Sequence, residues 1–300
     1  MRDMFIKELV LHARKNDNIA LIVGDLGFSV VEPFAKEFPE RFINAGVAEQ
    51  NMTGIAAGMA SEGYHVFTYS IANFPTFRCA EQIRNDIDYH NLPVTVVAVG
   101  GGLAYGNLGY SHHAVQDFAL LRSMPNMLIA APGDPLEVSS CLEYLIDYPQ
   151  PSYLRINKAG EPYVHASKPV LLPGQPQLIK KNKHNDKLIL TTGAVLDLAL
   201  ETWEHNYEIK DNWSVGSLAL WGEACRQIAY SKLNKYSKIV TLEEHLLSGG
   251  FGSWLLELGL NNKPFPLANA VCGMVGIQSY LREEGNLAFN KIASFISKEM

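Results

Sequence analysis

The sequence predicts an α/β protein made of two three-layer domains, each with a mostly parallel sheet between two layers of helices. Short, continuously apolar runs alternate along the chain with longer helical segments, which is typical of parallel strands buried on both faces. The chain has 300 residues, enough for two domains with separate cores. A stretch rich in proline and lysine separates the two series of elements.

The first series begins with an amphipathic helix over residues 3–14, an apolar strand over 19–23 and a glycine-containing turn over 24–27. Further strands are predicted at 65–69, 94–99 and 127–131, and further helices at 47–62, 77–88, 114–123 and 135–147. Together these elements predict a first domain over residues 1–160.

The composition changes between residues 153 and 187, where prolines and lysines accumulate as in an exposed linker. We place this linker at 161–186. A second series follows, with strands predicted at 188–193, 215–220, 239–242 and 268–272. It predicts a second domain over residues 187–300.

Composition and charge exclude several classes of protein. The net charge of -6 gives no electrostatic reason to expect nucleic acid or an anionic membrane as partner. No apolar stretch approaches the roughly 20 residues that span a bilayer, and acids near the N-terminus argue against a signal peptide. The four cysteines are widely spaced, so we expect reduced core thiols in a cytoplasmic protein and no metal site: Cys79, Cys141, Cys225 and Cys272.

The run 46–52 places one carboxylate, Glu49, in the first turn of a helix that is otherwise small and apolar. Such a helix packs closely on its neighbours, so we expect Glu49 to be poorly hydrated. A carboxyl group held in such a place can donate and accept protons near neutral pH. The alternative is an exposed acid that only complements the helix dipole.

Ligands of α/β sheets gather at the carboxyl ends of strands, and three segments leave such ends. They are the turn with Asp25, the aromatic run 67–78, and the glycine-rich run 100–113 that ends in His112 and His113. The glycine spacing does not match a nucleotide-binding loop, so we expect these glycines to let the backbone approach a ligand closely. The aromatic residues as core, and the histidines as structural residues, remain open alternatives.

Separated motifs resemble the transketolase family in order and spacing, over essentially the whole chain. They are Gly46-Val47-Ala48-Glu49-Gln50-Asn51-Met52, Phe74 with Arg78-x3-Gln82-Ile83-Arg84-Asn85, Gly106-x2-Gly109-x2-His112, Leu121-Arg122-x2-Pro125-Asn126-Met127, Pro132-Gly133-Asp134, and Thr241-Leu242-Glu243-Glu244-His245-x3-Gly249-Gly250-Phe251-Gly252. The resemblance is to the C-terminal half, a pyrimidine-binding domain with the thiamine-diphosphate-binding fold followed by the transketolase C-terminal domain. The G-D-G and N-N pattern of the other half, which holds the diphosphate through a divalent cation, has no counterpart at Gly24-Asp25-Leu26.

The resemblance implies the second subunit of a split transketolase-like enzyme that depends on thiamine diphosphate. It implies a diphosphate-binding N-terminal subunit as partner, in an α2β2 heterotetramer, with Mg²⁺ or another divalent cation held by that partner. The implied reaction transfers a two-carbon ketol unit from a ketose donor to an aldehyde or aldose acceptor.

Several residues match cofactor positions of the family. Glu49 matches the acid that hydrogen-bonds the aminopyrimidine and promotes its imino tautomer. Phe74 matches the aromatic that stacks on the pyrimidine, an arrangement that adds about 0.5–1.5 kcal/mol beyond burial. Ile71 lies beside it where many relatives have Phe, and Asp25 and Arg78 match positions near the cofactor.

The substrate positions depart from the family pattern. His112 matches the histidine that faces the substrate carbonyl. Leu108 replaces an Asp that binds a donor hydroxyl, and losing that partner would weaken recognition by about 1–3 kcal/mol. Lys158 replaces a phosphate-binding Arg and can act only as a point charge, with Arg155 expected to assist, while a phosphate-binding His falls near Gly100. We therefore expect a biosynthetic transfer onto an unusual sugar or aldehyde, not pentose-phosphate cycling.

Two other functions remain open. One is the β subunit of a 2-oxo-acid decarboxylating or acyloin-forming enzyme with the same cofactor, which carbon dioxide release would reveal. The other is a non-catalytic assembly or regulatory paralogue, which Leu108 favours and which Glu49 and His112 argue against. The acids and histidine at 243–245 are interpreted as packing and interface residues.

Overall fold

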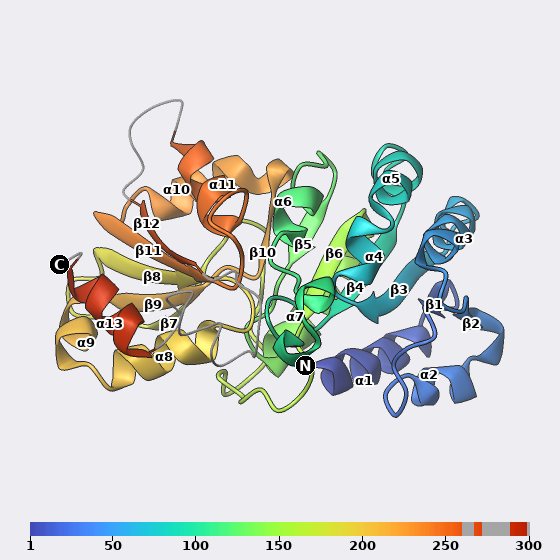
Figure 1. The fold of residues 1–300 in the computed structure, drawn as a ribbon, viewed down its shortest axis with the longest axis horizontal. Coiled ribbons are helices and arrows are strands. Elements are labelled where there is room, and N and C mark those ends of the chain that lie inside the picture. Colours follow the sequence, from blue (N-terminus) through green and yellow to red (C-terminus); the bar gives the residue numbers. More distant parts are fainter. Residues whose placement is uncertain (260–266, 272–288, 299–300) are drawn as a thin grey trace.

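The computed structural model describes residues 1–259, 267–271 and 289–298, and it contains two open sheets flanked by helices (Figure 1). Seven strands form the first sheet and five form the second, and nearly all pairs are parallel, which confirms the predicted fold class. In spatial order, the first sheet contains β10 (Leu220–Gly222), β5 (Leu128–Ala130), β6 (Ser152–Ile156), β4 (Val94–Val99), β3 (His65–Ile71), β1 (Ile19–Val23) and β2 (Phe42–Asn44).

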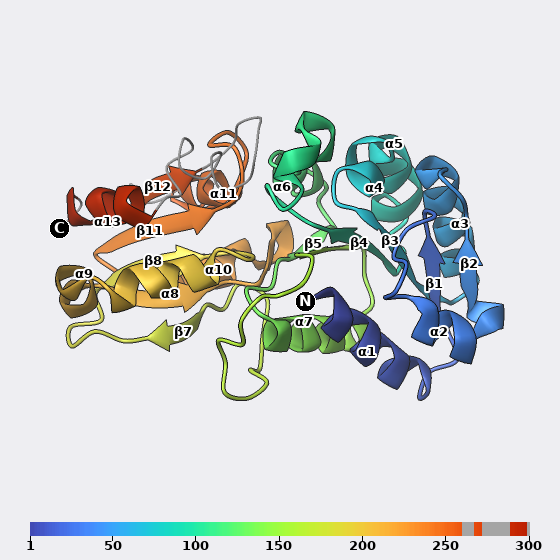
Figure 2. The same cartoon turned by 60° about the horizontal axis from the view of Figure 1, so that its bottom comes forward.

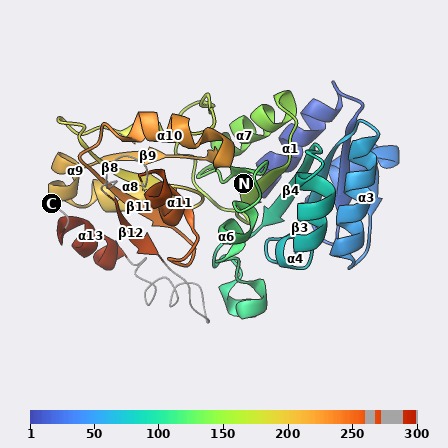
Figure 3. The same cartoon turned by 90° about the horizontal axis from the view of Figure 1, so that it is seen from above.

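Helices cover both faces of the first sheet. Seen from above, α1 (Arg2–Ala13) and α7 (Pro135–Asp147) lie on one side, and α3 (Glu49–Ser61), α4 (Phe74–Phe77) and α6 (Asp117–Leu121) lie on the other (Figure 3). The short α2 (Glu32–Glu37) joins the α1 side through buried Phe34. Because β1 and β4 are buried along their whole length, they read as almost continuous apolar runs in the sequence.

The second sheet is built in the same way. Its spatial order is β12 (Leu267–Val271), β11 (Lys238–Glu243), β8 (Lys187–Thr191), β9 (Ser214–Ser217) and β7 (Gln177–Lys180). One face is covered by α8 (Leu196–Glu204), α9 (Tyr207–Asn212) and α13 (Phe289–Lys298), and the other by α10 (Arg226–Leu233) and α11 (Phe251–Leu258) (Figures 1 and 2).

One segment predicted as a single helix is broken in the structure. Residues 77–88 were expected to be one helix, but they comprise the end of α4, the short α5 (Ala80–Gln82) and a π-helical turn at Ile83–Asp88. The break follows from Cys79, whose backbone leaves helical geometry between α4 and α5. Likewise, the helix expected from 114 begins only at Asp117, because Ala114 pairs with Gly102 in an isolated bridge.

The expected exposed linker is more ordered than its composition indicates. The first four residues of the proline- and lysine-rich stretch, 153–156, belong to β6 and are buried. Residues 177–180 form β7, which pairs antiparallel with β9 at the edge of the second sheet. The strand expected at 215–220 is divided, because β9 stays in the second sheet while β10 returns to the first and pairs antiparallel with β5. The domain division at 161–186 stays a prediction.

The two sheets share a continuous core. The ring of Trp221 in β10 is fully buried, and its centroid lies 5.2 Å from both Phe118 of the first half and Trp254 of α11. Cys79, Cys141 and Cys225 are buried and unpaired, as expected, while Cys272 lies outside the described residues. None of the helices in the described ranges has the length and apolar character needed to cross a lipid bilayer.

A buried group of titratable side chains lies where α7 begins. Asp134 caps α7 by accepting from the Glu137 backbone N–H. It also accepts from the backbone N–H of His165 in the linker, and its Oδ2 lies 3.1 Å from Nδ1 of the His165 ring. Glu137 is fully buried and accepts from Gly133 N–H at 2.7 Å and from the hydroxyl of Ser217 at the end of β9 at 3.0 Å. Helix, linker and second sheet therefore meet at these carboxylates.

Burial raises the pKa of Glu137 to about 7 and outweighs the hydrogen bonds it accepts. Burial lowers the pKa of His165, but its hydrogen bond to Asp134 and the Glu137 charge outweigh that and leave the pKa raised. Because the folded-state pKa of Glu137 lies above its unfolded value of 4.5, its stabilising contribution is fully present below that value. The contribution is lost as the pH rises through about 7.

We expect Glu137→Gln to reduce the fall in unfolding temperature between about pH 6 and pH 8, because glutamine keeps an acceptor and cannot ionise. Thermal unfolding over that range measures the difference from the unmodified chain. Glu143→Gln is the control, since Glu143 lies on the same helix with half its side chain exposed. Equal pH slopes for Glu137→Gln and the unmodified chain would contradict the assignment.

Candidate active site

Glu49 begins α3 and is 4% exposed, so the expected poorly hydrated position is confirmed. It lies at the carboxyl ends of two central strands: a side chain placed at Gly24, directly after β1, would meet Glu49 and the Ser70 hydroxyl of β3. Arg78 donates to the two carboxylate oxygens of Glu49 at 3.1 and 3.2 Å. In the described part of the chain this is the one ion pair that Glu49 makes.

Phe74 presents its half-buried ring beside this carboxylate. The Arg78 guanidinium carbon lies 4.0 Å from the ring centroid, and the His112 ring meets Phe74 edge-on at a centroid distance of 5.0 Å. Ile71, the last residue of β3, is half-buried nearby in the chain. The structure therefore brings together Glu49, Phe74, Arg78 and His112, which come from three separated sequence motifs.

His112 and its neighbour have different environments. His113 is 1% exposed and its Nε2 lies 3.1 Å from the Gly106 carbonyl, so it is a structural residue of the loop. His112 is half-buried, and its Nδ1 lies 3.0 Å from the Ser111 hydroxyl. Burial, together with the charges of Arg78 and His113, lowers the pKa of His112. The neutral imidazole therefore predominates at neutral pH, and its one N–H can donate a hydrogen bond to a ligand oxygen.

Two expected ligand residues lie on exposed loops around this group. Asp25 has a positive φ of 54°, and it exchanges hydrogen bonds with Asn44: its backbone N–H donates to Asn44 at 3.1 Å and its carboxylate accepts from the amide at 3.0 Å. Asn44 ends β2, the edge strand beside β1. Leu108 is 50% exposed in the loop that leads to His112.

Tyr105, which was not predicted as a site residue, continues the row of rings beyond His112. Its centroid lies 6.3 Å from that of His112, and the Lys158 ammonium lies 4.3 Å above the Tyr105 ring. Burial and the charge of Arg2 lower the pKa of Lys158. The Lys158 ammonium thus lies at the far end of a row of side chains that starts at Glu49 and continues through His112 and Tyr105. Nothing in the local sequence pattern marks Tyr105, because its position depends on the fold of the glycine-rich loop.

Three glycines of this loop leave no room for a ligand, contrary to expectation, whereas a Cβ at Gly109 would meet open space. A Cβ at Gly100 would collide with the Tyr105 ring, one at Gly101 with Arg155, and one at Gly102 with Glu244. Glycine at these three positions therefore leaves space that the protein's own side chains fill.

Arg155 was expected to assist substrate binding, but it is a structural residue. It is 5% exposed, its Nε lies 2.8 Å from the fully buried carboxylate of Asp117, and it donates to the carbonyls of Ala114 and Glu244. A guanidinium held by these groups joins the first half of the chain to the second and is not available to a substrate.

The residues at 243–245 pack at the same junction, as interpreted from the sequence. Glu243 caps α11 by accepting from Phe251 N–H at 2.6 Å and from Gly252 N–H at 2.8 Å, and burial raises its pKa to about 7. The His245 ring stacks on Phe118 at a centroid distance of 5.5 Å.

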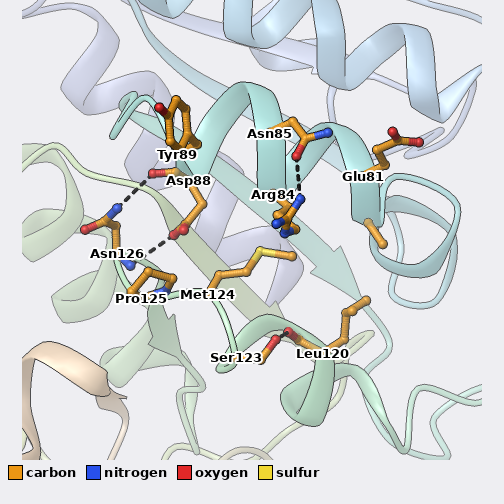
Figure 4. Close-up of a pocket in the computed structure, with 11 residues that line it drawn as sticks. Glu81, Arg84, Asn85, Asp88, Tyr89, Leu120, Ser123, Met124, Pro125 and Asn126 are labelled. Atoms are coloured by element: carbon orange, nitrogen blue, oxygen red, sulfur yellow. Dashed lines mark hydrogen bonds between the residues drawn. The ribbon is translucent and has the colours of Figure 1, made fainter.

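A further cavity is separate from these residues. It has a volume of about 650 Å³ and lies between the π-helical turn and the segment after α6 (Figure 4). Arg84 on its wall donates to Asn85 at 2.8 Å, and Asp88 accepts from the backbone of Asn126. None of the predicted site residues lines it.

The doubly flanked parallel sheets define an α/β protein with the transketolase fold. The chain belongs to the transketolase family: the model of the transketolase pyrimidine-binding domain matches residues 1–160.

Individual relatives narrow this class. The chain is 33% identical, over its whole length and 96% of the other protein, to a putative transketolase C-terminal section of Methanocaldococcus jannaschii. It is 31% identical over 89% of its length to a subunit of the apulose-4-phosphate transketolase of Phocaeicola vulgatus, and it covers 85% of that subunit. A solved split-gene transketolase, described as an inactive β4 tetramer, superposes with a TM-score of 0.86 at 30% identity, over 99% of this chain and 96% of that one.

We expect Arg155→Met to lower the free energy of unfolding by about 3–5 kcal/mol, because it leaves Asp117 buried without its counter-charge. Chemical denaturation measures this loss. Lys158→Met is the matched control and should cost less than about 1 kcal/mol, since Lys158 is half-buried and contacts a ring. A larger loss for Lys158→Met than for Arg155→Met would contradict the assignment of Arg155.

Proposed function

We propose that this chain is the second subunit of a split transketolase that uses thiamine diphosphate to transfer a two-carbon ketol unit from a ketose to an aldehyde or aldose acceptor. The observation that carries the proposal is Glu49, a nearly buried carboxylate at the ends of β1 and β3 with an aromatic ring beside it. The chain's membership of the transketolase family supports the same assignment.

The residues present fit the aminopyrimidine half of the cofactor. An aminopyrimidine needs an aromatic face to stack on and a carboxyl group at its ring edge. Phe74 and Glu49 supply these two features at one place, since Arg78 contacts both at once. Ile71 and Asp25 complete the cofactor-binding set that we propose, Ile71 as an apolar neighbour and Asp25 at the loop after β1.

Thiamine diphosphate bound here would supply a nucleophilic carbon for attack on a ketose carbonyl. In this chain, Glu49 shares a proton with the pyrimidine ring nitrogen and so controls the basicity of the amino group. Phe74 fixes the plane of the ring. His112, a neutral imidazole, donates a hydrogen bond to the substrate oxygen where charge develops.

Lys158 and Leu108 determine which substrate fits. Lys158 lies above Tyr105 at the far end of the row and attracts an anionic substituent of the sugar. Leu108 offers no partner to a donor hydroxyl, so ordinary ketose phosphates bind less well. Relatives named for apulose 4-phosphate and for 6-deoxy-6-sulfo-D-fructose support an unusual anionic sugar as the substrate.

A partner subunit is part of the proposal, because this chain lacks the diphosphate-binding motif. Large apolar side chains are exposed near Asp25, Glu49 and His112, as expected for a surface that another chain covers: Phe28, Val47 and Tyr110. We propose a cytoplasmic α2β2 assembly in which the partner holds the diphosphate and a divalent cation. The relatives named as a transketolase subunit or as a C-terminal section support this division.

We expect Glu49→Gln to preserve the fold and to reduce proton exchange at C2 of the bound cofactor by at least about 100-fold, because glutamine cannot share a proton with the ring. Proton NMR of the assembled enzyme in deuterated buffer measures this exchange. Glu81→Gln, on α5, is the control and should exchange at the normal rate. Unchanged exchange in Glu49→Gln would remove Glu49 from this role.

The isolated chain should bind thiamine diphosphate weakly and turn over no ketose, and the partner subunit should restore both. Calorimetry of each mixture and an assay of ketol transfer from phosphorylated and unphosphorylated ketoses measure these outcomes. Tight, stoichiometric cofactor binding by the chain alone would contradict the divided site. Carbon dioxide release from a 2-oxo acid without ketol transfer would contradict the reaction.

A further inference from the structure

Arg78 lies in the position that the proposed function gives to the aminopyrimidine. Its guanidinium carbon is 4.0 Å above the Phe74 ring, the spacing of a stacked planar group. Its Nη1 is 3.1 Å from Glu49, the spacing of a hydrogen bond to the carboxylate. These are the same two contacts that Phe74 and Glu49 would make with a pyrimidine.

Two planar groups cannot occupy this volume together. A guanidinium is flat, with its N–H donors at the edge, so it satisfies a ring face and a carboxylate in the same way as an aminopyrimidine. The Glu49 side chain is 4% exposed and cannot turn to another partner in solvent, whereas the Arg78 side chain is 48% exposed. Arg78 is therefore the group that can leave.

We propose that Arg78 is a placeholder: it occupies the pyrimidine position in the cofactor-free chain, neutralises Glu49 there, and is displaced when the cofactor enters. This rests on the proposed function, and it reverses the expectation that Arg78 is a ligand of the bound cofactor. The displacement makes cofactor binding weaker than the bare site allows, because the apparent Kd is the intrinsic Kd divided by the fraction of time that Arg78 leaves the position free.

The environment of His112 supports the same arrangement. Arg78 is one of the charges that lower the pKa of His112, next to burial. When Arg78 leaves, the pKa of His112 rises towards its ordinary value. The placeholder thus connects occupation of the pyrimidine position with the protonation of the histidine that faces the substrate.

The aminopyrimidine half of the cofactor alone, 4-amino-5-hydroxymethyl-2-methylpyrimidine, tests the displacement on the full chain without a diphosphate site. We expect Arg78→Ala to tighten its binding about five- to tenfold, since one ion pair and one cation–π contact no longer compete. Arg84→Ala is the matched control. Arg84 is also in the 78–85 motif, but it pairs with Asn85 on the wall of the other cavity (Figure 4) and should leave binding unchanged.

Weaker or unchanged binding of the pyrimidine by Arg78→Ala would overturn the placeholder while leaving the proposed function intact. No binding by any variant, together with no thiamine diphosphate binding by the assembled enzyme, would contradict the proposed function and the placeholder with it. The two failures are therefore distinguishable.

A second measurement does not depend on added ligand. In the free chain, Arg78→Gln should raise the pKa of His112, and Arg84→Gln should leave it unchanged. NMR of the imidazole protons as a function of pH measures this pKa. The single variant Arg78→Gln should also unfold at a lower temperature than the double variant that carries both Arg78→Gln and Glu49→Gln. The reason is that the double variant leaves no buried charge unpaired. Absence of both effects would show that Arg78 does not occupy this position in solution.

Discussion

The site depends on one carboxylate that the fold keeps almost out of water. Glu49 follows an edge strand and opens a helix of small residues, so α3 packs closely on β1 and β3 and leaves the side chain 4% exposed. A buried carboxylate needs either a counter-charge or a hydrogen-bonding partner. Arg78 provides the first, and a pyrimidine ring would provide the second. The exchange of one partner for the other is the physical basis of the function that we propose.

The rest of the chain holds this carboxylate and its neighbours in place. The junction of the two halves contains Arg155 paired with buried Asp117, and β10 returns from the second half to extend the first sheet. The start of the loop that carries His112 is held at this junction, because Gly101 and Gly102 pack directly on its side chains. The second sheet therefore supports the geometry of the site although it contributes none of the proposed catalytic groups.

Much of this could be predicted from the sequence. Buried parallel strands produce continuous apolar runs, so β1 and β4 were predicted with their observed limits, and so was the helix at 135–147. The burial of Glu49 followed from the small residues around it. The roles of Arg155, Tyr105 and the loop glycines could not be predicted, because each depends on contacts between segments far apart in the chain. The division of 215–220 between two sheets likewise has no local signal.

The central claim is that Glu49 contacts the pyrimidine of thiamine diphosphate at a site completed by a second subunit. A crystal structure of the assembled enzyme with the cofactor tests it most directly. The account predicts that a carboxylate oxygen of Glu49 lies about 2.6–3.0 Å from the pyrimidine ring nitrogen, with the ring on Phe74 and Arg78 turned away. A bound cofactor whose pyrimidine lies elsewhere, with Glu49 still paired to Arg78, would contradict it.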